Sequence, residues 1–166
     1  VTDEEQMHRR RALRTKLGFG DDDVVCVYSG RFHPGKNPLC LAQAIQMLHM
    51  EDQRFKALFI GSGAPDEIEA IRQCAGCVVH PFVEYARLPD LYRAADIGVW
   101  PKQESTSQLD AAACSLPLIL SNRVEVRERV DGNGLVYEED NPHDLAAQIR
   151  IVSDPETRRR MGQLGA

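Results

Sequence analysis

Short, unbroken apolar runs alternate along this chain with longer segments of helical periodicity. The first run covers residues 24–28, follows three aspartates and ends at a Ser-Gly pair. An apolar run of this length is typical of a strand buried on both faces, as in a parallel sheet. The next segment, residues 38–50, has Leu41, Ile45 and Leu48 at helical spacing and a proline in its first turn. A strand followed by a helix is therefore the first unit of the fold.

The same cycle recurs to the end of the chain. Further strands are expected at residues 57–60, 78–79, 97–100, 118–120 and 135–137, and helices at residues 3–17, 66–74, 88–95, 107–114, 124–130, 144–152 and 156–164. Strands that alternate with helices form parallel β-α-β units with right-handed crossovers. A chain of 166 residues has the length of one domain. We therefore predict an α/β fold, a single Rossmann-like doubly wound parallel sheet over residues 1–166.

The charge balance of the chain limits its partners. Lys and Arg number 20 against 25 Asp and Glu, which gives a net charge of −5. Nucleic-acid binding needs clustered basic residues, so we expect no nucleic-acid partner. The apolar runs are far shorter than the ~20 residues that cross a bilayer, and we expect no transmembrane segment and no signal peptide. An anion site within a single loop stays compatible with this balance.

The cysteines indicate a compartment. They number five, which is odd, and are Cys26, Cys40, Cys74, Cys77 and Cys114. Three lie in apolar stretches, where a free thiol behaves as a small hydrophobic group. Free thiols indicate a reducing, cytoplasmic environment. Cys74, Cys77 and His80 have the chemistry of zinc ligands, but a structural site needs a fourth ligand that the nearby sequence lacks, so we expect no metal site.

The loop after the first strand carries the first candidate site. Ligands of open parallel sheets bind outside the carboxyl ends of the strands. This loop runs from Gly30 to Asn37, and its two cations, Arg31 and Lys36, could hold a diphosphate. Two solvated loop charges are the alternative that this segment leaves open. A nucleoside-triphosphatase loop is disfavoured, because Pro34 removes a backbone N–H and Asn37 stands where a hydroxyl would bind magnesium.

The loop after the fourth strand is the more specific feature. Glu104, Ser105, Thr106 and Ser107 lead into a helix that carries Asp110 in its first turn. Hydroxyls and free backbone N–H groups at the positive end of a helix suit an anion. A capping box between Ser107 and Asp110 accounts for the same residues without a ligand, and both interpretations stay open.

Ordered motifs extend over the whole chain. They are Ser29-Gly30-Arg31 with Lys36, Ile60-Gly61-Ser62-Gly63, the run LPDLYRAAD at 88–96, Pro101, DAAACSLP at 110–117 and DGNGL at 131–135. Together they resemble the carboxyl-terminal domain of retaining family-4 glycosyltransferases, which have the GT-B fold and bind the nucleotide-sugar donor with this domain. The resemblance implies that residues 1–166 are one domain of a larger protein, whose amino-terminal acceptor-binding domain is absent from this chain.

The resemblance implies roles for individual residues. Arg31 and Lys36, beside Gly30, correspond to the pair that holds the donor diphosphate. Phe82 and Val83 correspond to the part that meets the base. The family needs no catalytic metal or other cofactor, because its cations and a helix end stabilise the leaving diphosphate.

The family also has a motif of two glutamates separated by seven residues. Asp110 corresponds to the second glutamate, which contacts the ribose of the nucleotide. Glu104 is the candidate for the first, which contacts the transferred sugar, although the residue at the family's spacing is Lys102. Ser115 stands where the family usually has a glycine.

The function implied by the resemblance is transfer of a sugar from a nucleoside diphosphate sugar to an acceptor, with retention of configuration. Arg31, Lys36 and Glu104 would then be the catalytic residues. Two alternatives stay open: a sugar-nucleotide epimerase of GT-B fold and a non-catalytic sugar-nucleotide-binding subunit. The expected partners are the donor and the missing acceptor domain, through which the protein could touch a membrane surface.

Overall fold

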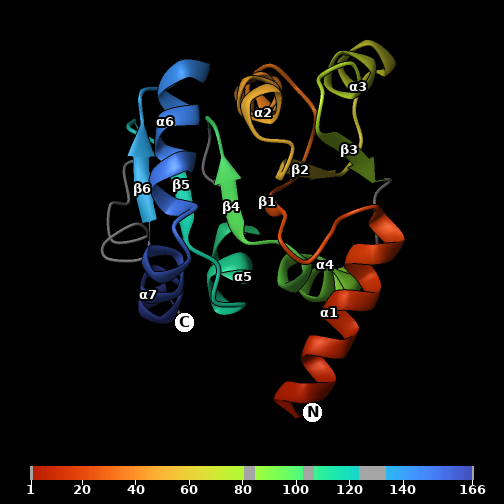
Figure 1. The fold of residues 1–166 in the computed structure, drawn as a ribbon. Helices are drawn as coiled ribbons and strands as arrows, with labels where there is room; N and C mark the ends of the chain where they lie inside the picture. The colour runs from red at the N-terminus through yellow and green to blue at the C-terminus, as the bar shows by residue number, and fades with distance from the viewer. Residues whose placement is uncertain (1, 81–84, 103–106, 124–133, 166) are drawn as a thin grey trace.

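The fold is built around one parallel sheet. A computed structural model describes residues 2–80, 85–102, 107–123 and 134–165. Its strands are β1 (Val24–Ser29), β2 (Phe55–Ile60), β3 (Cys77–His80), β4 (Ile97–Trp100), β5 (Leu118–Ser121) and β6 (Gly134–Tyr137). They pair in the order β3-β2-β1-β4-β5-β6, and every pairing is parallel (Figure 1). The predicted parallel sheet is confirmed.

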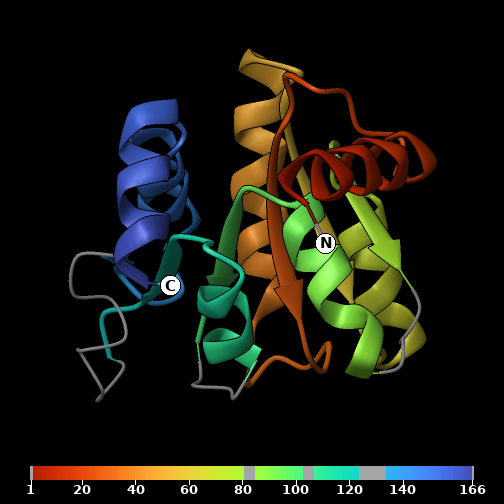
Figure 2. The same ribbon diagram turned by 90° about the horizontal axis from the view of Figure 1, so that it is seen from below.

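Helices cover both faces of this sheet. They are α1 (Asp3–Leu17), α2 (Pro38–Glu51), α3 (Pro65–Arg72), α4 (Leu88–Ala94), α5 (Ser107–Ala113), α6 (Pro142–Val152) and α7 (Pro155–Gly165). On one face α2 packs against α3 and α6, and on the other α4 packs against α1 and α5. Figure 2 shows α1 and α4 in front of the strands and α2 behind them. The doubly wound arrangement is therefore confirmed as well.

The predicted elements agree with the structure except near their ends. β2 begins at Phe55, two residues earlier than predicted, because Phe55 and Lys56 pair with Val24 and Val25 of β1; the Lys56 ammonium lies 2.7 Å from Asp23. α3 ends at Arg72, and the two residues after it form a turn rather than a continued helix. A short 3-10 helix at Tyr85–Arg87 was not predicted. The helix predicted at 124–130 lies outside the described residues.

The core lies on both sides of β1. Its residues from Val25 to Tyr28 are at most 1% exposed, as the unbroken apolar run predicts. Beneath the end of this strand, Tyr28 lies with its ring centroid 6.2 Å from Phe32, 6.4 Å from Phe59 and 6.5 Å from Trp100. Burial of each such ring stabilises the fold by about 1.5–3 kcal/mol. The strand that precedes the first candidate loop is thus held in a dense aromatic cluster.

The first helix is attached by charge. Arg14 is the buried residue of α1, and α1 ends at Gly18, whose φ of +89° favours glycine. The Arg14 guanidinium donates to three backbone carbonyls, those of Asp23 at 2.7 Å, Gly20 at 2.8 Å and Ala94 at 2.8 Å. It also lies 3.3 Å from Asp96, a buried carboxylate that Arg10 contacts at 2.7 Å. α1 is therefore joined to the end of α4 through an ion-pair network.

Three properties expected from the sequence concern the cysteines, a metal site and a membrane-spanning helix. All five cysteines are free, and burial raises the pKa of the Cys40 thiol to about 11. In the described ranges, no three His, Cys, Asp or Glu side chains gather in a way that could hold a metal ion. Among the helices described, none has the length and apolar character needed to span a membrane.

Candidate functional site

The strand order creates a branch point at the carboxyl edge of the sheet. β1 pairs with β2 on one side and with β4 on the other, where Cys26 is opposite Ile97 and Val27 is opposite Gly98. The chain leaves β1 toward β2 and leaves β4 toward β5, so the loops after β1 and β4 diverge. Open parallel sheets bind ligands at such a point. Arg31 and Lys36 follow β1 here.

The loops after β1 and β2 run side by side past the strand ends. The backbone N–H of Gly30 donates to the last carbonyl of β2, and that of Phe32 donates to the Ser62 carbonyl, each at 3.0 Å. Gly30 and Gly61 have φ values of +144° and +145°. A Cβ at Gly61 would lie 1.9 Å from the Gly30 carbonyl oxygen, so the approach requires glycine there. This contact fixes the backbone on both sides of Arg31.

Side chains of the core hold the start of the loop after β1 by hydrogen bonds. The Tyr28 hydroxyl donates to the Arg31 carbonyl at 2.7 Å, and burial raises the pKa of this tyrosine, which keeps it a neutral donor. The indole N–H of Trp100 donates to the Ser29 carbonyl at 3.1 Å. The Ser29 and Tyr92 hydroxyls share a buried hydrogen bond of 2.7 Å. The backbone from which the exposed Arg31 side chain extends is therefore rigid.

The second half of the loop forms a turn that ends in α2. The His33 carbonyl accepts hydrogen bonds from the N–H groups of Lys36 and Asn37, each at 2.9 Å. The ring Nδ1 of His33 accepts from the Gly35 N–H, also at 2.9 Å. The side chain of Lys36 is half-buried where α2 begins. The loop thus presents a cation at each end, as the sequence predicts, with Arg31 exposed and Lys36 half-buried.

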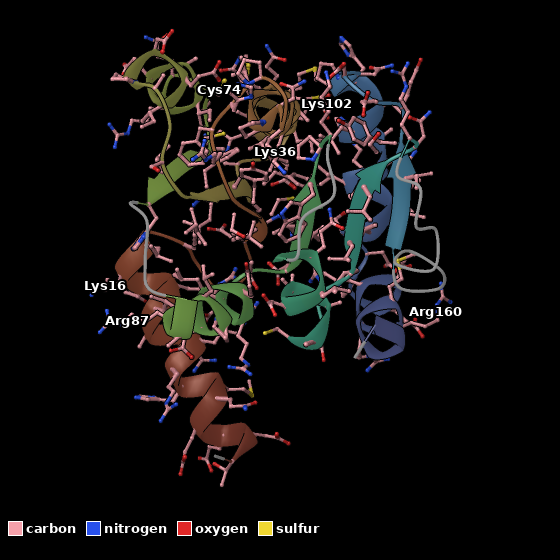
Figure 3. The ribbon with its side chains drawn as sticks, turned by 180° about the vertical axis from the view of Figure 1, so that it is seen from behind. Lys16, Lys36, Cys74, Arg87, Lys102 and Arg160 are labelled. Carbon is pink, nitrogen blue, oxygen red and sulfur yellow. The ribbon has the colours of Figure 1, made fainter. Side chains whose placement is uncertain are left out.

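A carboxylate joins this loop to two others. Asp140, in the loop after β6, accepts from the Asn37 side-chain amide at 2.7 Å and from the Lys102 ammonium at 3.1 Å. These donors hold the pKa of Asp140 below its usual value. The Tyr137 hydroxyl donates to the Pro101 carbonyl, one residue before Lys102. Figure 3 shows Lys36 and Lys102 near the tips of β4 and β5. This cluster was not predicted from the sequence, because its partners are far apart in the chain.

The remaining candidates are only partly described. Asp110 lies in the first turn of α5 and is partly exposed. α5 follows β4, and β4 ends at the same edge of the sheet as β1, after which come Gly30, Arg31 and Lys36. Five candidates, Phe82, Val83, Glu104, Ser105 and Thr106, lie outside the described residues, as does the side chain of Ser107. Ser115, just after α5, has a φ of +66°, a conformation that glycine adopts at lower cost.

A hollow of about 700 Å³ lies at the other edge of the sheet. It is bounded by α1, α5, α7 and the end of α4. Its lining includes Asp96 and Pro117, which precede β4 and β5 rather than follow them. Its Arg10 is paired with Asp96 at 2.7 Å. The hollow is therefore separate from the loops that carry the candidate residues.

These groups together suit an anion. Two cations flank one short loop, a third cation follows β4, and the backbone around Arg31 is fixed by glycine contacts and buried hydrogen bonds. Guanidinium and ammonium groups held on a rigid loop bind phosphate oxygens strongly, because little conformational entropy is lost on binding. Such an arrangement also stabilises negative charge that develops on a leaving phosphate.

Comparison with known proteins supports the family resemblance. The sequence profile of the family described as "Glycosyl transferases group 1" matches residues 23–154. The D-inositol 3-phosphate glycosyltransferase of Xylanimonas cellulosilytica is 35% identical over 95% of this chain, and the match covers 40% of that protein. The chain therefore spans about two fifths of the length of this curated relative.

Solved structures share the fold at low sequence identity. HepE of Anabaena in complex with UDP superposes with a TM-score of 0.80 at 18% identity, covering 95% of this chain and 46% of HepE. The C-terminal domain of the group 1 glycosyl transferase LpcC of Francisella tularensis superposes with a TM-score of 0.75 at 17% identity. That match covers 94% of this chain and 88% of the LpcC domain.

Proposed function

This chain belongs to the group 1 glycosyltransferase family, and we propose that it is the donor-binding domain of a retaining glycosyltransferase. The observation that carries the proposal is the loop after β1, which presents Arg31 and Lys36 at the branch point of the sheet. In this proposal the two side chains bind the diphosphate of a nucleoside diphosphate sugar. Asp110 contacts the ribose, Glu104 the sugar, and Phe82 and Val83 the base.

The chemistry follows from where negative charge develops. When the bond between the sugar and the diphosphate breaks, charge accumulates on the leaving phosphate oxygens. Arg31 and Lys36 stabilise that charge more in the transition state than in the ground state, which lowers the barrier. We propose that these cations do this without a metal ion, and we expect EDTA to leave nucleotide affinity unchanged.

The remainder of the reaction requires a part that this chain does not contain. The chain spans about two fifths of its curated relative, and we propose that the acceptor binds to a separate amino-terminal domain. We expect this chain alone to bind a donor and to transfer no sugar. Five free thiols are consistent with our proposal that the protein works in the cytoplasm.

The first test is calorimetric titration of the chain with UDP, the nucleotide named in the HepE complex. GDP and ADP are titrated in parallel, because the base is not known. We expect one of them to bind, and Arg31→Ala and Lys36→Ala each to weaken it by about 1–3 kcal/mol, the contribution of a charge-assisted hydrogen bond. Lys16→Ala, an exposed cation on α1, is the matched control and should leave affinity unchanged (Figure 3). Equal affinity in all three variants would make the loop cations mere solvated charges.

A second test separates the ribose contact from the phosphate contact. Asp110→Ala should weaken UDP and leave the affinity for inorganic pyrophosphate, which has no ribose, unchanged. If Asp110 acts as a helix-capping residue instead, the variant loses about 0.5–2 kcal/mol of stability and keeps its affinity for both. Glu104→Ala should bind UDP as the wild type does and bind a UDP-sugar less tightly. Equal loss of UDP and UDP-sugar would remove Glu104 from the sugar site.

A further inference from the structure

One carboxylate connects three loops at the edge of the sheet that carries the proposed donor site. Asp140 follows β6, Asn37 ends the loop after β1, and Lys102 is the second residue after β4. The two oxygens of Asp140 are used separately: Oδ1 accepts from Asn37 at 2.7 Å and Oδ2 from Lys102 at 3.1 Å. The Asn37 and Lys102 side chains are therefore bridged by this one carboxylate.

Asn37 and Asp140 both have an unusual backbone conformation. Asn37 has a φ of +47° and Asp140 a φ of +64°, in the left-handed region that glycine adopts at the lowest cost. Asn37 also stands at the N-cap position of α2, yet its side chain makes no capping hydrogen bond. Its amide is directed to Asp140 instead. Asparagine and aspartate are among the few non-glycine residues that tolerate this region, and here the side chains of the two residues bond to each other.

Stability accounts for only a small part of this arrangement. The Lys102 and Asp140 side chains are 32% and 47% exposed, and ion pairs with this exposure contribute little to stability because water screens them. Asn37 follows Lys36 directly, and Lys102 immediately precedes residues 103–106, which include the Glu104 candidate. The contacts therefore join the loop that carries Lys36 to Lys102, which lies two positions before Glu104 in the sequence.

We propose that Asp140 is a positioning residue of the donor site, one that fixes the Lys36 end of the loop after β1 relative to Lys102 after β4. The inference rests on the proposed function, since the relative position of the two segments matters only if both contact one ligand. Without the carboxylate, the hydrogen bonds that join Asn37 to Lys102 through Asp140 are lost. Binding must then supply the ordering that Asp140 otherwise provides in advance.

The decisive variant is Asp140→Gly. Glycine adopts a φ of +64° more easily than aspartate, so the variant should fold and should melt at the same temperature as the wild type or higher. Its affinity for UDP should nevertheless fall about tenfold, within the usual range of coupling between linked sites. Asp52→Gly is the matched control, because Asp52 also pairs with a cation in solvent but lies before β2, at the opposite edge. It should bind UDP as the wild type does.

An exchange of the two side chains tests the link directly. Asn37→Asp alone places two carboxylates against each other and should weaken UDP binding. Adding Asp140→Asn restores one amide and one carboxylate in reversed positions, and we expect the double variant to bind UDP more tightly than Asn37→Asp. Both asparagine and aspartate tolerate the left-handed region, so the backbone is preserved.

The outcomes separate the two proposals. If the wild-type chain binds neither UDP nor the other nucleoside diphosphates, the proposed function fails and the positioning role fails with it. If the wild type binds and Asp140→Gly binds equally well, only the positioning role of Asp140 is refuted. A lower melting temperature of Asp140→Gly with unchanged UDP affinity would show a purely structural role and would also refute it.

Discussion

Replacement of Arg14 by methionine should weaken the attachment of α1 to the rest of the domain. Arg14 is 2% exposed and is the buried residue of α1, whereas Leu13 and Leu17 pack against the core while only partly buried. Methionine matches the length of the aliphatic stem but donates no hydrogen bond. The change therefore removes the charge and all of its donors while keeping most of the packing.

The expected loss follows from the groups that Arg14 leaves behind. Removing one partner of a buried ion pair costs about 3–5 kcal/mol, because the other charge stays buried. After the substitution the Asp96 carboxylate still has two partners, the Arg10 guanidinium at 2.7 Å and the Val25 N–H at 2.9 Å. We therefore expect the lower end of that range. The carbonyl of Ala94, a residue 1% exposed, loses its Arg14 donor. We expect a loss of about 3 kcal/mol, or about 6–12 °C in melting temperature for a domain of this size.

Urea unfolding followed by circular dichroism measures this loss as a shift of the midpoint. Arg11→Met is the matched control: Arg11 lies on the same helix and pairs with Asp21 at 3.2 Å, but the two side chains are 66% and 62% exposed. It should cost less than about 0.5 kcal/mol. Arg14→Lys should recover little, because one ammonium cannot reach carbonyls that lie in several directions. A loss below about 1 kcal/mol in Arg14→Met would refute the ion-pair account of α1.

Three further results are expected. Gly61→Ala should cost about 2–3 kcal/mol in urea unfolding and weaken UDP binding, because the new Cβ would force the loop away from the Gly30 carbonyl; a neutral result would contradict the need for glycine. Ser115→Gly should raise stability by about 1 kcal/mol in thermal unfolding, because its φ of +66° favours glycine, and a lower melting temperature would contradict this. The pKa of Asp140 is lowered mainly by the hydrogen bond from Asn37, so the carboxylate stabilises the fold at neutral pH and this contribution is lost as pH falls below about 4. Any excess of the wild-type melting temperature over that of Asp140→Asn should therefore shrink between pH 7 and pH 3, and an excess that grew would contradict the sign.

The parts of the fold that were predicted correctly depend on local patterns. The unbroken apolar run of β1 predicts a strand buried on both faces, because successive side chains of a strand point to opposite faces and here both sets are apolar. Gly18 predicts the end of α1, because a left-handed residue after a helix is cheapest as glycine. The loop cations Arg31 and Lys36 could be named in advance, since the carboxyl edge of a parallel sheet follows from strand order along the chain.

The contacts that were missed join residues far apart in sequence. Arg14 and Asp96 are 82 positions apart, and each is a charged residue of a type that usually lies on the surface. Asn37 and Asp140 are 103 positions apart, and neither lies in a motif that predicts the other. A glycine-like conformation at two non-glycine positions is the signal that marks them, and it becomes visible only in the backbone angles. The sequence alone predicts which edge binds, while the structure reveals what holds that edge in place.

The central place of β1 in the sheet has a consequence for synthesis of the chain. β1 can pair with β2 as soon as β2 emerges from the ribosome, but its other edge waits for β4, whose last residue follows β2 by 40 positions, from Ile60 to Trp100. At about 5–20 residues per second, this interval lasts roughly 2–8 s. Throughout it, an apolar strand exposes a row of unpaired backbone groups, which is a template for pairing with another nascent chain. The topology that places the proposed donor site between β1 and β4 therefore also sets a period in which the growing chain is exposed to mispairing.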